Sequence, residues 1–175
     1  MKNTMRKAVA LSTVTVAAIA AAGVSWAQPA PKTTRAALEG SWTLVSIVNE
    51  KDGVKSDSPM GANPLGLFIY DRGGRYSVQI YRQGLAPIAA NDRNKGTAEE
   101  YKAIMQGSLS HFGTYTVDEK AGTFTIRPVA GNYPNWVGKD QPRKFTVTGD
   151  ELKILNPSSS GDPASKSYLT LKRAK

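Results

Sequence analysis

The sequence predicts an all-β protein: an eight-stranded antiparallel up-and-down β-barrel with one amphipathic helix inserted at about residues 97–110. Three observations support this prediction. Short runs rich in β-branched and aromatic residues recur along the chain, turns containing glycine separate them, and several runs alternate apolar with polar residues. Short consecutive hairpins favour a closed barrel over the alternative, a two-sheet sandwich, because sandwiches tend to need long crossover connections. Closure also removes exposed edge strands.

The clearest hairpin covers residues 63–82, with the sequence NPLGLFIYDRGGRYSVQIYR. Strand-forming runs at residues 65–70 and 75–82 flank the turn DRGG at residues 71–74. Its glycines can adopt the positive φ that such turns require. Glycine-rich loops also bind phosphates, but no helix follows this one, so we interpret it as a turn.

The other predicted strands follow the same pattern. Apolar Phe124 and Ile126 alternate with Thr123 and Thr125, which is typical of a strand with one buried and one solvent-facing side. These strands are predicted at residues 43–48, 112–117, 123–129, 143–148, 151–156 and 167–173.

One helix is predicted between the strands. Thr97 and Glu100 have the spacing of a capping box, in which each side chain accepts a hydrogen bond from the other residue's backbone N–H. Apolar residues then recur at helical spacing, at Tyr101, Ile104, Met105 and Leu109. We expect a helix whose apolar stripe packs on the sheet. His111 is placed at its C-terminus, where the helix dipole favours a cation, or at the barrel mouth as a group that titrates near neutral pH.

The N-terminus has the composition of a cleaved signal peptide, assigned to residues 1–27. Basic residues precede an Ala-rich apolar stretch at residues 8–22, and small residues Ser25 and Ala27 follow it. We expect cleavage between Ala27 and Gln28, a periplasmic or secreted location, and no stable membrane insertion afterwards. A flexible segment at residues 28–37 and a barrel domain at residues 38–175 would follow.

The composition excludes several kinds of site. The chain has no cysteine and one histidine, which excludes His/Cys zinc sites and Cys–His nucleophilic catalysis. No dinucleotide or P-loop motif is present, so we expect no cofactor and no metal. The formal net charge is +9, but basic and acidic residues are interspersed, so we expect no nucleic-acid partner. The sequence carries no signal for an oligomeric state.

A family resemblance begins at Gly40-Ser41-Trp42, which is similar to the Gly-x-Trp signature of lipocalins. In lipocalins a late arginine packs over that tryptophan, and Arg173 or Lys172 is the matching candidate. The chain resembles the bacterial and fungal lipocalin-like domain proteins, and the resemblance implies an eight-stranded barrel with a pocket but no particular reaction. The matching stretches are GSWTLVS (40–46), NPLGLFIYDRGGRYSVQI (63–80), GTAEEYKA (96–103), FGTYTVDEKAGTF (112–124) and NWVGKDQPRKF (135–145).

Strand alternation also indicates which side chains line the barrel. If Val78 and Ile80 face the lumen, Tyr76 and Arg82 do so as well. A buried arginine must be paired or meet an anionic ligand; alternatively, Arg82 ends its strand and extends into water. The candidate ligand-binding residues are Tyr76, Val78, Ile80, Arg82, Tyr115, Phe124, Trp136 and Arg143, with Trp136 either lining the rim or filling the barrel end as core.

We therefore predict a binding protein. Eight-stranded barrels have room for side chains or one small ligand, and the predicted lining suits a hydrophobic or amphipathic molecule, including one with an anionic group opposite Arg82 or Arg143. One alternative is a metal-independent enzyme of isomerase, cyclase or hydrolase type, which needs a titratable group such as Tyr81 or Asp92 inside a pocket. Another is a filled barrel that acts as an interaction protein of the cell envelope.

Overall fold

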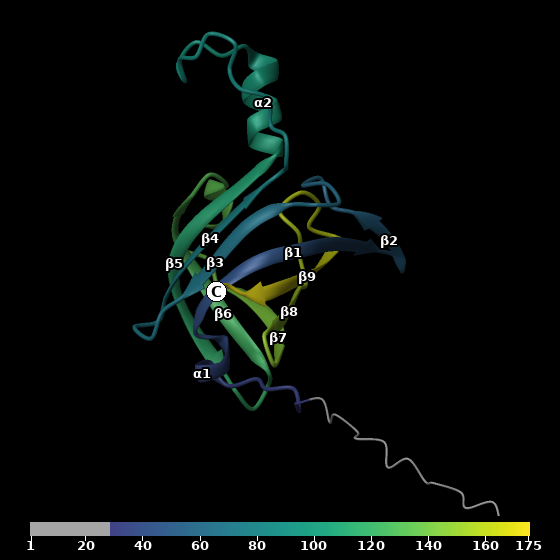
Figure 1. Cartoon of the computed structure of the whole chain (residues 1–175), viewed down its shortest axis with the longest axis vertical. Helices are drawn as coiled ribbons and strands as arrows, with labels where there is room; N and C mark the ends of the chain where they lie inside the picture. The colour runs from purple at the N-terminus through teal and green to yellow at the C-terminus, as the bar shows by residue number, and fades with distance from the viewer. Residues whose placement is uncertain (1–28) are drawn as a thin grey trace, which may run out of the picture.

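The computed structural model describes residues 29–175, and the predicted signal peptide with its cleavage site lies outside them. Eight antiparallel strands form a closed barrel, because each strand pairs with the next and β1 pairs with both β3 and β9 (Figure 1). The predicted fold class is confirmed. The barrel strands are β1 (Gly40–Lys51), β3 (Leu65–Tyr70), β4 (Arg75–Tyr81), β5 (Ser108–Asp118), β6 (Thr123–Gly131), β7 (Gln141–Thr148), β8 (Glu151–Asn156) and β9 (Lys166–Arg173).

A ninth, short strand extends the sheet beyond the barrel. Strand β2 (Val54–Asp57) lies between the strands predicted at residues 43–48 and 65–70, where the sequence analysis predicts no strand. It pairs with the last residues of β1, from Val48 to Lys51, and projects to one side of the barrel (Figure 1). All of its residues are exposed, so it adds nothing to the core.

The barrel interior is packed solid at one end. Burial alternates along the strands as the sequence indicates, so that in β4 Tyr76 is buried while Arg75 is exposed. Four side chains at this end are completely buried: Leu38, Trp42, Leu152 and Leu171. We call this the closed end and the opposite one the mouth.

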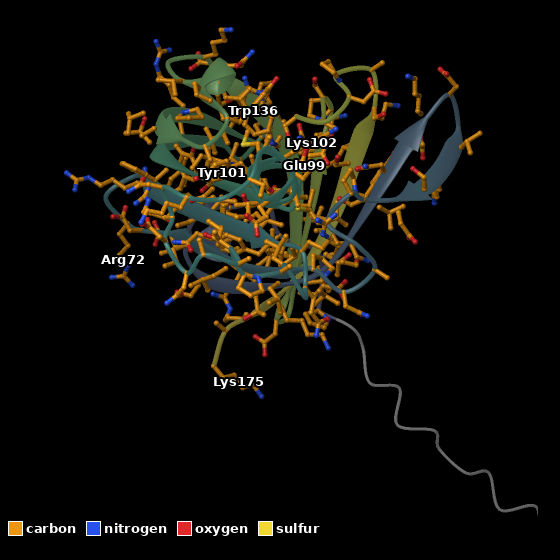
Figure 2. The ribbon with its side chains drawn as sticks, turned by 90° about the horizontal axis from the view of Figure 1, so that it is seen from above. Arg72, Glu99, Tyr101, Lys102, Trp136 and Lys175 are labelled. Atoms are coloured by element: carbon orange, nitrogen blue, oxygen red, sulfur yellow. The ribbon has the colours of Figure 1, made fainter. Side chains whose placement is uncertain are left out.

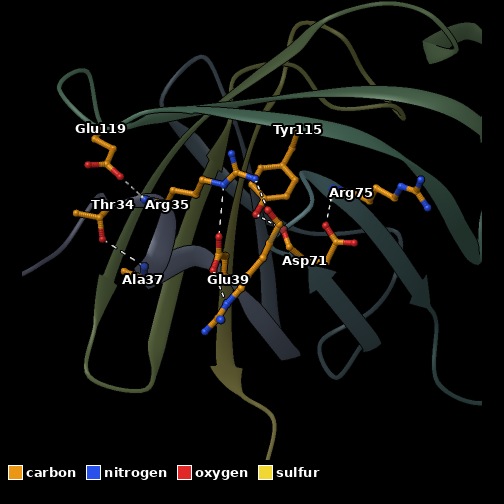
Figure 3. A network of polar contacts seen from close by, with 9 residues as sticks. Thr34, Arg35, Ala37, Glu39, Asp71, Arg75, Tyr115 and Glu119 are labelled. Atoms are coloured by element: carbon orange, nitrogen blue, oxygen red, sulfur yellow. Dashed lines mark hydrogen bonds and ion pairs between the residues drawn. The ribbon is translucent and has the colours of Figure 1, made fainter.

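The residues just before the barrel cover its closed end. Residues 28–37 were expected to be a flexible lead-in, yet Lys32 pairs with Val147, and helix α1 (Arg35–Leu38) follows. The Arg35 guanidinium pairs with Glu39 at 3.4 Å and lies 5.4 Å from the centre of the Tyr115 ring. Figure 3 shows this network between α1 and the β3–β4 turn. It ties the N-terminal segment to the barrel.

The hairpin turn at residues 71–74 has the predicted form. The Asp71 carboxylate accepts a hydrogen bond from the Arg75 backbone N–H at 2.7 Å, and Gly74 has a φ of 81°. A side chain at Gly74 would be strained in this region, which explains the glycine. The conformation of the turn is therefore determined by residues within the turn itself and directly after it.

Gly113 occupies a steric constriction between β5 and β6, at a register shift next to Phe112. A β-carbon there would overlap the backbone carbonyl oxygen of Arg127. We expect Gly113→Ala to lower the free energy of unfolding by about 1–3 kcal/mol, because the backbone of β6 must move. Urea denaturation measures this loss. Gly161→Ala is the control, since its added methyl meets only the Ser159 hydroxyl, at 3.9 Å. Equal free energies of unfolding for the two variants would contradict the claim that no room exists for a β-carbon at residue 113.

Helix α2 (Ala98–Gln106) forms where predicted, with both hydrogen bonds of the Thr97–Glu100 capping box, but it ends earlier than residue 110. Its predicted packing on the sheet is wrong. None of its residues is buried, and the helix rises beyond the mouth (Figure 1). The reason is that β4 and β5 pair directly, so the segment between them stays at the barrel end.

The helix packs instead against its own preceding loop, and we call residues 82–107 the arm. The Tyr101 hydroxyl accepts from the Gly96 backbone N–H at 2.8 Å and donates to the Arg93 carbonyl at 3.0 Å. The Arg82 backbone N–H donates to the Gly107 carbonyl at 2.7 Å, which closes the base of the arm. No helix in residues 29–175 combines the length and apolar character needed to span a bilayer.

Candidate ligand-binding site

A cavity opens at the mouth of the barrel. Its volume is about 560 Å³, within the range of small-molecule sites, and a narrower space of about 60 Å³ lies deeper in the lumen. Figure 2 looks onto this end of the molecule, with Trp136 on one side and the β1–β2 extension projecting on the other. The two spaces adjoin, because Ile80, Leu109, Trp136, Asn156 and Leu169 line both. We call the smaller one the inner cavity.

Polar and apolar residues both line the mouth. Among the polar ones, Asn49, Ser58, Asn156 and Ser167 come from β1, the loop after β2, β8 and β9, and the Ser167 hydroxyl donates to the Asn49 side-chain oxygen at 2.8 Å. The apolar residues come from the same elements and from the rest of the opening: Ile47, Met60, Ile80, Met105, Leu109, Trp136 and Leu169. An amphipathic molecule can meet both kinds of residue at once.

The sequence analysis missed these polar lining residues, although a signal for them existed. Asn49 is two residues from buried Ile47, and Ser167 is two residues from buried Leu169. Alternate residues of a strand point the same way, so both polar residues face the lumen with their apolar neighbours.

His111 lies inside the barrel on β5, so its predicted place at a helix C-terminus is wrong. It is buried, and its Nδ1 is 2.9 Å from the Tyr76 hydroxyl. Burial, together with the nearby Arg143 cation, lowers the pKa of His111 to about 4. Burial also raises the pKa of the Tyr76 phenol. The pair is therefore neutral at neutral pH, which also overturns the expectation that His111 titrates there.

The buried state of His111 predicts that acid destabilises the barrel. An unfolded histidine has a pKa near 6.5, whereas folded His111 has a pKa of about 4. Between these values the unfolded chain binds the extra proton, so stability is lost as the pH falls through this window. We expect a loss of about 2 kcal/mol from this residue between about pH 7 and pH 5. Urea denaturation of the protein and of His111→Gln at both pH values isolates this contribution, and identical pH dependence would contradict it.

Arg143, on β7, also faces the lumen. Its guanidinium lies 5.6 Å from the centre of the Trp136 ring, and its Nη1 donates to the Pro142 carbonyl at 2.9 Å. Among residues 29–175 it is the only buried side chain that carries a charge at neutral pH. Burial lowers the pKa of Arg143 to about 10, which leaves it a cation at neutral pH.

The other predicted site residues divide between the cavity and the closed end. Phe124, Val78 and Ile80 line the inner cavity with Trp136 and Arg143. Arg82 lies half-buried at the mouth, where it lines the outer cavity and its Nη2 approaches the Ala103 carbonyl at 3.4 Å.

Three residues singled out from the sequence lie elsewhere. Tyr115 lies at the closed end, where its hydroxyl donates to the Asp71 carbonyl at 2.7 Å. Tyr81 is exposed and Asp92 belongs to the arm, and neither lines the two cavities described above. Within residues 29–175 no three His, Cys, Asp or Glu side chains converge as metal ligands do.

The Gly-x-Trp signature residues close the opposite end of the lumen. The Arg173 guanidinium lies 4.2 Å from the centre of the Trp42 ring and donates to the carbonyls of Glu39 and Ala37 at 3.0 and 3.1 Å. Gly40 has a φ of 121°, and a β-carbon there would lie 2.9 Å from Arg173 Nη1. Arg173, and not the exposed Lys172, therefore takes the place that the lipocalin pattern gives to its arginine.

A barrel sealed at one end and hollow at the other defines a cup-shaped ligand-binding protein. The sequence matches the model of the lipocalin-like domain family over residues 39–174, and the chain belongs to that family. It is also similar to the 4'-hydroxy-3'-methoxypropiophenone carrier protein ppsC of Aspergillus oryzae. The two are 30% identical over 105 residues, which is 55% of this chain and 95% of the fungal protein. The fold and this relative support a ligand-binding barrel.

Proposed function

We propose that this protein binds one small amphipathic molecule in the lumen and acts as its carrier. The cavity of about 560 Å³ at the mouth, opposite an end packed solid by Trp42, carries this proposal. A pocket of that size buries most of the surface of a drug-sized molecule, and burial of apolar surface drives binding.

The walls of the cavity favour a molecule with polar groups on an apolar frame. Ile80, Leu109 and Trp136 offer apolar contact, while Asn49 and Asn156 offer hydrogen bonds. The fungal relative is named as the carrier of an aromatic ketone that bears a hydroxyl and a methoxy group. A ligand of this general chemistry suits a lining of mixed polar and apolar residues, and we propose this class for the present chain.

Tryptophan fluorescence tests the proposal. Trp136 lines the cavity, whereas Trp42 is buried at the closed end. We expect saturable quenching when 4'-hydroxy-3'-methoxypropiophenone or dodecanoic acid is added to delipidated protein. The experiment uses the chain from Gln28 onward, which lacks Trp26. In Trp136→Phe the remaining signal should not respond, because Trp42 is out of reach of the ligand. Absence of saturable change with both compounds would overturn the proposal.

We propose in addition that the mature protein is exported. The support is the signal-peptide composition of residues 1–27. Expression of the full chain in a Gram-negative bacterium, followed by N-terminal sequencing of the periplasmic fraction, should give a protein that begins at Gln28. Uncleaved protein confined to the cytoplasm would contradict export.

A further inference from the structure

We propose that the inner cavity is an oxyanion site, in which Arg143 binds the ionised oxygen of an aromatic phenolate or carboxylate whose apolar body lies toward the mouth. This inference rests on the proposed function, because it assigns the ligand's chemical class and its orientation in the same lumen.

The first observation is the unpaired charge of Arg143. The ion pairs formed within residues 29–175 do not include it, and no carboxylate is buried in that part of the chain. Its neighbours are neutral at neutral pH: Trp136 lies against the guanidinium, and Tyr76 and His111 bond to each other. Tyr70 also lines the inner cavity near Arg143, and burial raises the pKa of its phenol. A buried charge without a counterion is costly, so an anion that enters the lumen gains from pairing with it.

The second observation is that the Arg143 guanidinium has N–H donors that form no hydrogen bond within the described residues. A guanidinium carries five N–H donors, and Arg143 uses one nitrogen, Nη1, in its hydrogen bond to Pro142. No buried side-chain nitrogen or oxygen in residues 29–175 is fully enclosed without a partner. The remaining nitrogens therefore keep access to open space, and Arg143 lines the inner cavity. They can donate to two oxygens of one ligand or to one oxygen and a water molecule.

The third observation is the shape of the space. The inner cavity holds about 60 Å³, which suits a head group and not a whole ligand, while about 560 Å³ is available above it. Aromatic rings line this passage, the place where the two spaces adjoin: Trp136 lines both spaces, its ring meets that of His111 edge to face at 5.6 Å, and Tyr133 packs on Trp136 at 5.5 Å. A flat ring with an ionised oxygen fits this passage head first, because it can stack on these rings while its oxygen reaches Arg143.

The inference predicts that the barrel selects the ionised form of a phenol. When a neutral phenol binds as its phenolate, its proton leaves to solvent, since His111 stays neutral above about pH 4. Burial raises the pKa of the Tyr76 phenol in the same lumen although Arg143 is near. Selection of the ionised form therefore requires that direct contact between the ligand oxygen and the Arg143 guanidinium outweighs desolvation, so that the apparent pKa of a bound phenol falls below its value in water.

Three probes of matched shape test this: para-nitrophenol, para-nitrobenzoate and the uncharged ether para-nitroanisole. The absorption spectrum of para-nitrophenol distinguishes its neutral and ionised forms. We expect bound para-nitrophenol to show the phenolate spectrum at a pH where the free compound is mainly neutral. We expect Arg143→Met to weaken binding of the anions about 10- to 100-fold, the range for losing a hydrogen bond to a charged group. Binding of para-nitroanisole should not weaken.

The outcomes distinguish failure of the oxyanion site from failure of the proposed carrier function. A phenolate spectrum in the unmodified protein supports the oxyanion site without recourse to any variant. Stronger binding of para-nitrophenol or of para-nitrobenzoate identifies which oxyanion the site prefers. Equal binding of ether and anions, with a neutral phenol spectrum, would overturn the oxyanion site and leave the carrier proposal intact. Failure of all three probes, of dodecanoic acid and of 4'-hydroxy-3'-methoxypropiophenone would overturn both.

Discussion

Replacing Trp42 by alanine is expected to lower the free energy of unfolding by about 3–5 kcal/mol, the usual cost of removing a buried tryptophan. Trp42 is completely buried at the closed end, and its indole N–H donates to the Leu38 carbonyl at 2.8 Å. The Arg173 guanidinium covers its ring. The substitution removes the ring, leaves the Leu38 carbonyl without its donor and deprives Arg173 of its aromatic partner.

Urea denaturation followed by circular dichroism measures this loss. Trp136→Ala is the matched control, because Trp136 is only half-buried and lines a cavity that is already open. We expect it to cost roughly 1 kcal/mol, the centre of the range for ordinary substitutions. Similar losses in the two variants would show that the closed end is not the main support of the barrel.

Replacing Arg143 by methionine is expected to raise the free energy of unfolding of the empty protein by about 1–4 kcal/mol, the range found when buried ionic groups give way to apolar side chains of similar size. Methionine has similar length and no charge, so the cost of burying an unpaired guanidinium disappears. The loss of the contact with Trp136 offsets roughly 0.5–1 kcal/mol of the gain. The same change should abolish the preference of the lumen for anionic ligands. The variant should therefore be more stable when empty and bind anions more weakly.

Thermal and urea denaturation of delipidated protein test whether Arg143→Met raises the free energy of unfolding. Arg82→Met is the control, since Arg82 lies half-exposed at the mouth and can extend its charge toward water. Its effect should stay within about 0.5 kcal/mol. If Arg143→Met proves less stable than the unmodified protein, the Arg143 side chain stabilises the fold. That result would contradict an unpaired charge that is available to a ligand.

The parts of the fold that local chemistry determines could be predicted from the sequence. The DRGG turn, the Thr97–Glu100 capping box and the alternation around Tyr76 each depend on neighbouring residues only. The position of α2 could not be predicted, because it depends on the direct pairing of β4 with β5. His111 was misplaced because Leu109 continues the helical spacing of Tyr101, Ile104 and Met105 although it already belongs to β5.

The candidate site was predicted in part. Strand alternation correctly placed Val78 and Ile80 in the lumen, and Arg143 was singled out as a possible partner of an anion. The Tyr76–His111 contact joins residues 35 positions apart, so no local pattern indicates it. Which end of the lumen is filled also depends on α1 and on Arg173, which meet only in the folded chain.

The structure also bears on the two alternatives to a carrier. Burial shifts the pKa values of His111 and Tyr76 away from neutrality, so that neither is a ready acid or base at neutral pH. The cavity at the mouth also differs from the solid interior that a filled interaction barrel requires. The cavity favours binding over a filled barrel.

Isothermal titration calorimetry of the protein with a blocked mouth tests the central claim most directly. Leu109 lines both parts of the cavity, so Leu109→Trp should place a bulky ring where they adjoin and obstruct the lumen, whereas Thr114→Trp adds the same ring at an exposed position of the same strand. With dodecanoic acid or 4'-hydroxy-3'-methoxypropiophenone we expect binding at one site per chain, with a negative heat-capacity change, in the unmodified protein and in Thr114→Trp, and none in Leu109→Trp. Unchanged binding by a folded Leu109→Trp variant, or no binding by the unmodified protein, would contradict a ligand site in the lumen.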